Sequence, residues 1–396
     1  MQRPIYLDHH ATTPLDVAVL DAMMPYLTDA FGNAASKTHP YGWEAEEAVE
    51  TARAQVAGLI HADPEEIVFT SGATESDNLA LKGVAMAYRD RGHHLITSPT
   101  EHKAILDTCH FLEQQGFEIT YLPVDRTGRV NPDDVRNAIT PQTILVSIMH
   151  VNSEIGTIAP LAEIGAITRE HGVLFHSDAV QSVGKIPVDV DALQVDLLSI
   201  SGHKIYGPKG VGALYVRQTG PQRIRLEPIV HGGGHERGMR SGTLNVPGIV
   251  GLGKACGIGH DLMPEESVRL GRLRQRLYKG LTSRLDDVYL NGHPELRVPG
   301  NLNLCFARVQ DESLLLSLKD IVALSAGSAC TSESHEPSYV IQAIGVEPSL
   351  AHSAIRFGLG RHTTEAQIDT VIDAVVEKVE RLRALAPSPT PVTSGS

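Results

Sequence analysis

The feature that most constrains the fold is the regular alternation of short apolar runs with amphipathic segments between about residues 67 and 215. Helical periodicity predicts helices over 75–91, 104–115 and 161–171, and another beginning at the capping residue Asn131. Strands are predicted over 67–69, 94–97, 118–122, 143–149, 174–176, 197–201 and 210–215. Because strands alternating with helices form βαβ crossovers, this region predicts an α/β fold with a mostly parallel sheet covered by helices on both faces.

A different pattern begins after about residue 260. Helices are predicted over 268–284, 313–319 and 364–383, and strands over 301–306 and 354–359, the first with its apolar side chains on one face. This pattern predicts a smaller α+β domain, and two domains are the simplest count for 396 residues. The segment from Ala386 is rich in Pro, Ser and Thr and is predicted to be disordered.

Charge and cysteine usage exclude several classes of protein. The net charge of −13 disfavours a general role in binding nucleic acid or anionic membranes. No run approaches the ~20 apolar residues of a membrane helix, and the N-terminus lacks the pattern of a signal peptide. Four cysteines without a CxxC motif are typical of a chain in the reducing cytoplasm, which is the expected location.

Three polar clusters at predicted strand ends carry the candidate chemistry. Lys204 follows the strand 197–201, where an amine shielded in a pocket can attack a carbonyl. Asp178 follows another strand and has the charge to pair with a pyridinium nitrogen. The turn 70–75 leads into a helix and can bind a phosphate through its backbone N–H groups. Taken separately they are a surface charge, a cap and a capping motif; together they indicate pyridoxal 5'-phosphate (PLP).

The motifs that carry these residues resemble those of the cysteine desulfurases of the IscS/NifS group, closest to the housekeeping type. The resemblance extends from Tyr6 to about Arg383 and rests on a set of motifs in a fixed order: YLDHHATTP (6–14), TSGATESDN (70–78), TEH (100–102), HVN (150–152), DAVQSVGK (178–185), SGHK (201–204), HGGGHER (231–237), RSGT (240–243), GSACTS (327–332) and AIRF (354–357). It implies the PLP-dependent transferase fold type I. The implied domains are a large PLP-binding domain over 16–260 and a small domain made of 1–15 plus 261–385, with the tail 386–396 outside both.

The resemblance also implies a role for each cofactor-binding residue. Lys204 holds PLP covalently and moves the Cα proton, Asp178 pairs with the ring nitrogen, and His102 stacks on the ring and serves in proton transfer. The ring's phenolic oxygen is bound by Asn152 and Gln181. The phosphate is held by Ala73, Thr74, Ser201 and His203, and by Thr243 from the other subunit of a homodimer.

Sulfur transfer is assigned in the same way. Arg356, helped by Asn33 and Asn152, binds the carboxylate of the substrate L-cysteine. Cys330, in a loop of small polar residues at about 325–335, is the nucleophile that becomes a persulfide. Cys109, Cys256 and Cys305 are predicted to be buried hydrophobes.

The implied activity converts L-cysteine to L-alanine and passes sulfur to an iron–sulfur scaffold or other acceptor proteins. No dedicated metal site is expected, although Cys330 is a possible transient iron–sulfur ligand. The alternatives that remain are a selenocysteine lyase, another class V PLP enzyme such as an aminotransferase, and a non-catalytic binding protein.

Overall fold

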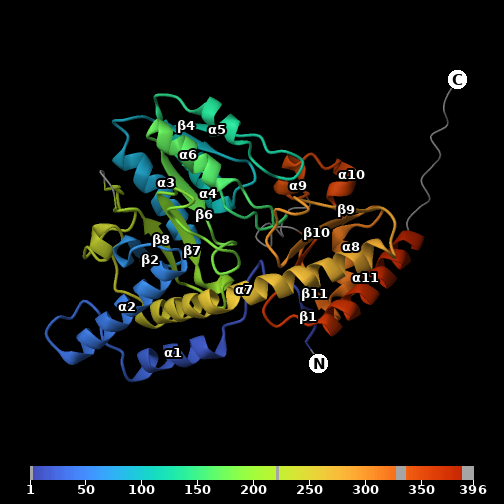
Figure 1. The fold of residues 1–396 in the computed structure, drawn as a ribbon, viewed down its shortest axis with the longest axis horizontal. Coiled ribbons are helices and arrows are strands. Elements are labelled where there is room, and N and C mark those ends of the chain that lie inside the picture. Colours follow the sequence, from blue (N-terminus) through green and yellow to red (C-terminus); the bar gives the residue numbers. More distant parts are fainter. Residues whose placement is uncertain (1–2, 220–222, 327–335, 386–396) are drawn as a thin grey trace.

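The computed structural model describes residues 3–219, 223–326 and 336–385. Among these residues a seven-stranded sheet forms the centre of the larger part of the molecule (Figure 1). Its strands follow the order β2 (Ile67–Thr70), β8 (Gly212–Val216), β7 (Leu197–Ser201), β6 (Leu174–Asp178), β5 (Thr143–Ser147), β3 (His94–Thr97) and β4 (Glu118–Tyr121). β8 is antiparallel to both of its neighbours, β2 and β7, and the other pairs of this sheet are parallel, so the mostly parallel sheet predicted from the sequence is confirmed.

Helices cover both faces of this sheet. On one face α3 (Ala73–Ala87) and α4 (Lys103–Gln114) form a core with strand residues such as Leu145 and Leu197. On the other face α5 (Pro132–Ala138) and α6 (Leu161–His171) pack on the adjacent strand residues Val146 and Leu198. Because successive side chains of a strand point to opposite faces, two cores require nearly continuous apolar strands, as observed.

Three further helices lie along this second core. α1 (Val17–Thr28) and α2 (Pro40–Leu59) were not anticipated, and α7 (Val246–Thr282) begins well before the predicted start at residue 268. Glycines at 248, 251, 253, 257 and 259 lower the helix propensity of this first half. Tertiary packing overrides this low propensity, because glycine allows neighbouring helices to approach α7 closely. A Cβ on Gly253 would lie only 2.5 Å from Cα of Ala52 in α2.

A smaller part of the molecule surrounds a second sheet, in the order β12 (Ala354–Gly358), β10 (Asn301–Phe306) and β9 (Val288–Leu290). α8 (Asp311–Leu318), α11 (Glu365–Leu385) and the second half of α7 pack on it, and Leu7 joins their core. β1 (Ile5–Tyr6) pairs with β11 (Val322–Ala323) beside this core. The short helices α9 (Tyr339–Ala343) and α10 (Pro348–Ala351) lie against the end of β10.

Two details concern the predicted elements of this smaller part. β10 was expected to alternate, yet it is buried on both faces, because Asn301 and Asn303 donate to the backbone carbonyl of Glu154 in the larger part. α7 runs through both parts (Figure 1) and therefore crosses the expected domain boundary at residue 260. Within the described residues, no helix is both long and apolar enough to cross a membrane.

Candidate active site

A cavity of about 500 Å³ opens where β6 and β7 end and α3 begins. The structure brings together most of the residues that the sequence singled out, since the cavity is lined by Ala73, Thr74, His102, Asp178, Gln181, Ser201, His203, Lys204 and Arg356. They come from strand ends and helix starts spread over nearly 300 residues of sequence. In open parallel sheets the carboxyl ends of the strands are where ligands bind.

Lys204 ends the short 3₁₀ turn Gly202–Lys204 that follows β7. Its Nζ donates to the backbone carbonyls of His10, at 2.5 Å, and Ala11, at 2.8 Å, in the N-terminal segment. A Cβ on Gly202 would lie 2.9 Å from the carbonyl oxygen of Pro208, so only glycine fits the turn that presents the lysine.

Asp178 is the last residue of β6 and is 5% exposed. One of its carboxylate oxygens accepts from the backbone N–H of Val180 at 2.9 Å. Burial raises the pKa of Asp178, while the nearby His102 and Lys204 favour its charged form. A buried carboxylate at a cavity wall is stabilised by a cation placed opposite it, and a protonated pyridine nitrogen fits that requirement.

The start of α3 forms a cradle for an anion. Its N-cap residue, Gly72, has a φ of 148° and no side chain to cap the helix, and Ala73 and Thr74 of the first turn line the cavity. First-turn N–H groups have no acceptor within their own helix, and the helix dipole favours negative charge at this end. Burial lowers the pKa of the adjacent His203 to about 4, so its imidazole is neutral at pH 7. The cradle therefore suits a phosphate.

His102 and Gln181 line the same cavity with defined hydrogen bonds. The Nδ1 atom of His102 caps α4 by accepting from the backbone N–H of Ala104 at 3.1 Å. Gln181 donates from Nε2 to the backbone carbonyl of His10 at 2.9 Å. These residues, with Lys204, Asp178 and the cradle of α3, match the chemistry of PLP: an aldehyde, a ring cation, a phenolic oxygen and a phosphate.

Arg356 reaches the cavity from β12 in the smaller part and is 2% exposed. Its guanidinium donates to the carbonyl of Ser153 at 3.0 Å, to Oδ1 of Asp8 at 3.0 Å and to Oγ of Ser325 at 2.8 Å. Its buried Nε has no hydrogen-bond partner among the described residues. A planar donor fork with unused capacity at a cavity wall suits a carboxylate ligand.

Four predicted site residues do not lie among the described residues that line the cavity. Asn33 is exposed between α1 and α2, where its Oδ1 accepts from the N–H of Ala35. Asn152 is buried, but its amide bonds the carbonyl of Thr100 and the N–H groups of Glu154 and Ile155. Thr243 is exposed on the surface, and Cys330 lies outside the described residues.

The other three cysteines, Cys109, Cys256 and Cys305, are buried as predicted.

Sequence reasoning missed the contribution of the N-terminal segment to the cavity wall. His10, Ala11 and Thr12 line the cavity, and Nδ1 of His203 lies 3.1 Å from Oγ1 of Thr12. The motif at 6–14 contained these residues, but nothing in its spacing indicates that they contact a lysine nearly 200 residues away.

Comparison with known proteins gives a consistent result. The family model for aminotransferase class V matches residues 5–371. A cysteine desulfurase IscS of Anaeromyxobacter dehalogenans (strain 2CP-C) is 60% identical over 387 residues, which is 98% of this chain and 95% of the relative. A cysteine desulfurase of Homo sapiens is 56% identical over 97% of this chain and 84% of the relative.

Solved structures agree in fold. A NifS-like protein superposes with a TM-score of 0.88 at 37% identity, covering 96% of this chain and 100% of the other. A structure described as SspA in complex with cysteine superposes with a TM-score of 0.80 at 38% identity, covering 91% of this chain and 100% of the other.

Proposed function

The chain belongs to the aminotransferase class V family and is a PLP-dependent cysteine desulfurase of fold type I. From this premise we propose which residues bind the cofactor, which bind the substrate and which transfer sulfur. The observation that carries the assignment is the convergence of Lys204, Asp178 and the α3 cradle on one cavity with Arg356. When bound, PLP withdraws electrons from the substrate's Cα and so makes its proton acidic.

The residues that line the cavity are assigned to different parts of the cofactor. Lys204 would bind it covalently and would then carry the proton to and from the substrate's Cα. Asp178 would keep the ring nitrogen protonated, and His102 would pack on the ring. Gln181 would donate to the phenolic oxygen. The backbone of Ala73 with the side chains of Thr74, Ser201 and His203 holds the phosphate.

Substrate binding and sulfur transfer use residues of the smaller part. Arg356 binds the carboxylate of L-cysteine through its guanidinium. The thiolate of Cys330 attacks the substrate's sulfur, so that an S–S bond forms and the Cβ–S bond breaks with its electron pair passing to carbon. Protonation of that carbon yields L-alanine, and the enzyme retains a persulfide. Asn33 and Asn152 do not line the cavity, so their binding to the carboxylate would require a movement of their loops toward the substrate.

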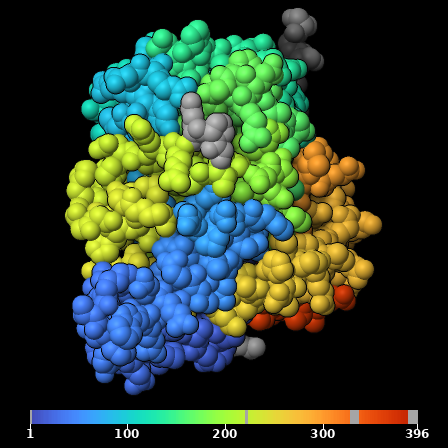
Figure 2. Space-filling view, turned by 60° about the vertical axis from the view of Figure 1, so that its left-hand side comes forward, coloured from blue at the N-terminus to red at the C-terminus, as the bar shows by residue number. Residues whose placement is uncertain are grey.

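A homodimer would complete the site with Thr243 from the second subunit. Figure 2 shows α1, α2 and the loop that precedes α7 side by side on one face. On α1, the following loop and the start of α2, large apolar side chains are exposed: Leu20, Met24, Leu27, Phe31, Tyr41 and Trp43. An apolar face of this kind marks an association surface, and the exposed Thr243 lies in that preceding loop.

The wider context of the reaction is proposed from the same premise. Persulfide sulfur passes from the enzyme to an iron–sulfur scaffold or another acceptor protein in the cytoplasm, and the buried free cysteines are compatible with reducing conditions. Two domains, 16–260 and 1–15 plus 261–385, fit the separate cores on either side of the middle of α7.

The direct test is to supply L-cysteine and a small thiol reductant and to measure alanine and sulfide. We expect equal amounts of both, with loss of turnover and of the visible absorbance of the lysine-bound cofactor in Lys204→Ala. A protein that releases alanine from L-selenocysteine but not from L-cysteine would contradict the desulfurase assignment and support the lyase.

A further inference from the structure

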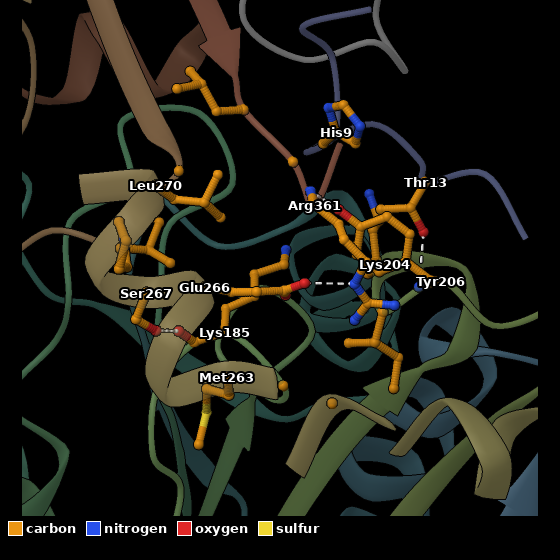
Figure 3. A pocket seen from close by; sticks show the side chains of 18 of the residues that line it. His9, Thr13, Lys185, Lys204, Tyr206, Met263, Glu266, Ser267, Leu270 and Arg361 are labelled. Atoms are coloured by element: carbon orange, nitrogen blue, oxygen red, sulfur yellow. Dashed lines mark hydrogen bonds and ion pairs between the residues drawn. The ribbon is translucent and has the colours of Figure 1, made fainter. Parts of the chain in front are cut away.

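Lys185 is a buried lysine that the proposed reaction does not use. It lines a small cavity of about 40 Å³ between α7 and the N-terminal segment, together with Lys204, Glu266 and Arg361 (Figure 3). His10 lines this cavity as well. His10 and Lys204 also line the large cavity, so they form a wall between the two spaces. Lys185 therefore lies next to the cofactor site, on the far side of the wall formed by His10 and Lys204.

The amine of Lys185 contacts the side chain of a proposed cofactor ligand. Its Nζ donates to Oε1 of Gln181 at 2.6 Å. Nδ1 of His10 lies 2.8 Å from the same oxygen, and Nε2 of Gln181 donates to the carbonyl of His10 at 2.9 Å. A backbone carbonyl only accepts hydrogen bonds, so the amide nitrogen of Gln181 must face the carbonyl of His10, and its oxygen faces Lys185.

This orientation matters for the large cavity, which Gln181 also lines. The amide nitrogen has two hydrogens, and one is used by the carbonyl of His10. The second hydrogen is available to an acceptor in the cavity. With the amide turned around, Gln181 would present an oxygen, which repels a phenolate.

Burying a lysine amine is costly unless something compensates it. Among the described residues no carboxylate forms an ion pair with Lys185, and Glu266 of the same small cavity pairs with Arg361 instead. Burial, together with the nearby Lys204 and Arg356, lowers the pKa of Lys185 well below its ordinary value. Burial lowers the pKa values of His9, His10 and His203, and the nearby Lys185 contributes to each lowering. Among the described residues, the hydrogen bond recorded for the Lys185 amine is the one that it donates to Gln181.

We propose that Lys185 is a positioning residue, which holds Gln181 with an amide N–H directed at the phenolic oxygen of PLP. This inference rests on the role assigned to Gln181 in the proposed function. It predicts that Lys185 and Gln181 act as one unit in cofactor binding, so that removing either makes the other dispensable.

The test is a double-mutant cycle read out as the affinity of the full-length protein, stripped of cofactor, for added PLP. Lys185→Met keeps the length of the side chain and removes the amine. We expect it to weaken PLP binding about tenfold in the parent and by less than about twofold in the Gln181→Ala background. Lys319→Met, at an exposed lysine after α8, is the matched control and should leave the affinity unchanged.

Equal losses from Lys185→Met in both backgrounds, or no loss in the parent, would overturn the inference. If Lys185→Met does not fold, the same cycle with Lys185→Leu, which also lacks a donor, applies the same criterion. If Gln181→Ala alone leaves the affinity unchanged, the assignment of Gln181 fails and this inference fails with it. A loss with Gln181→Ala but none with Lys185→Met refutes the role of Lys185 and leaves the proposed function intact.

Discussion

Glu101 lies directly before His102 and is a carboxyl group with no exposed surface. Its Oε1 accepts from the backbone N–H of Met149 at 2.9 Å and from Oγ of Ser98 at 3.2 Å. Its Oε2 has no partner among the described residues. Burial, and to a smaller extent Asp178, raises the pKa of Glu101 to about 8, so we expect it to be protonated in the folded protein at neutral pH.

The raised pKa makes stability depend on pH in a definite direction. Below the ordinary value near 4.5, Glu101 is protonated in both the folded and the unfolded chain, and its contribution is constant. Between 4.5 and about 8 the unfolded chain has released the proton that the folded chain retains, so stability falls as pH rises. With about 1.4 kcal/mol for each pH unit, the loss is about 3 kcal/mol by pH 7 and approaches about 5 kcal/mol at pH 9, as an upper bound.

Glu101→Gln replaces the acid by a neutral side chain of the same shape and removes this dependence. Urea unfolding of both proteins between pH 5.5 and pH 9 should show the variant gaining about 3 kcal/mol relative to the parent across that range. The comparison cancels the titration of all other groups. Glu380→Gln, at an exposed position of α11, is the control, and its free energy of unfolding should change with pH in the same way as that of the parent. Parallel profiles for Glu101→Gln would show that Glu101 is ionised in the folded protein and refute the reasoning.

Three further predictions concern the nucleophile, the loop before α7 and the tail. Cys330→Ser should still bind L-cysteine, with a change in the cofactor's absorbance, but alanine production should fall by orders of magnitude and persulfide labelling should vanish, whereas Cys109→Ser keeps both. Glu236→Gln breaks a buried pair in which Arg53 donates twice to Glu236, at 2.8 Å each, and should lower the free energy of unfolding by about 3–5 kcal/mol, measured by urea denaturation; a change under about 1 kcal/mol would contradict this. Deletion of 386–396 should leave alanine production with a small reductant unchanged, and a loss of activity would show that the tail is structural.

The central sheet was predictable because its strands are buried on both faces and separated by helices with clear caps. Asn131, for example, caps α5 by accepting from the N–H of Asp133, as its sequence context predicts. The first half of α7 was not predictable, since its glycines argue against a helix. The approach of segments that lie far away in sequence explains why glycine is required there: α2 at Gly253, and Met23 of α1 with Pro208 at Gly251.

The cavity was predictable to the extent that its residues end strands of one sheet. Asp178 ends β6 and Lys204 follows the adjacent parallel strand β7, so the topology itself brings them together. The placement of Asn152 was not predictable, because its amide is used by the turn in which it lies. Nor was the role of Lys185, whose contact with Gln181 depends on side-chain packing and not on strand order.

The N-terminal segment shows how a short motif can serve two distant parts of the site. Its backbone carbonyls at His10 and Ala11 accept from Lys204, while Asp8 accepts from Arg356. Thr13 extends the contact, since it donates to the carbonyl of His203 and accepts from the N–H of Tyr206. The same few residues therefore orient the lysine that holds the cofactor and the arginine proposed to hold the substrate. Because these two side chains come from different sheets, the segment that touches both determines how the cofactor and the substrate carboxylate are placed relative to each other.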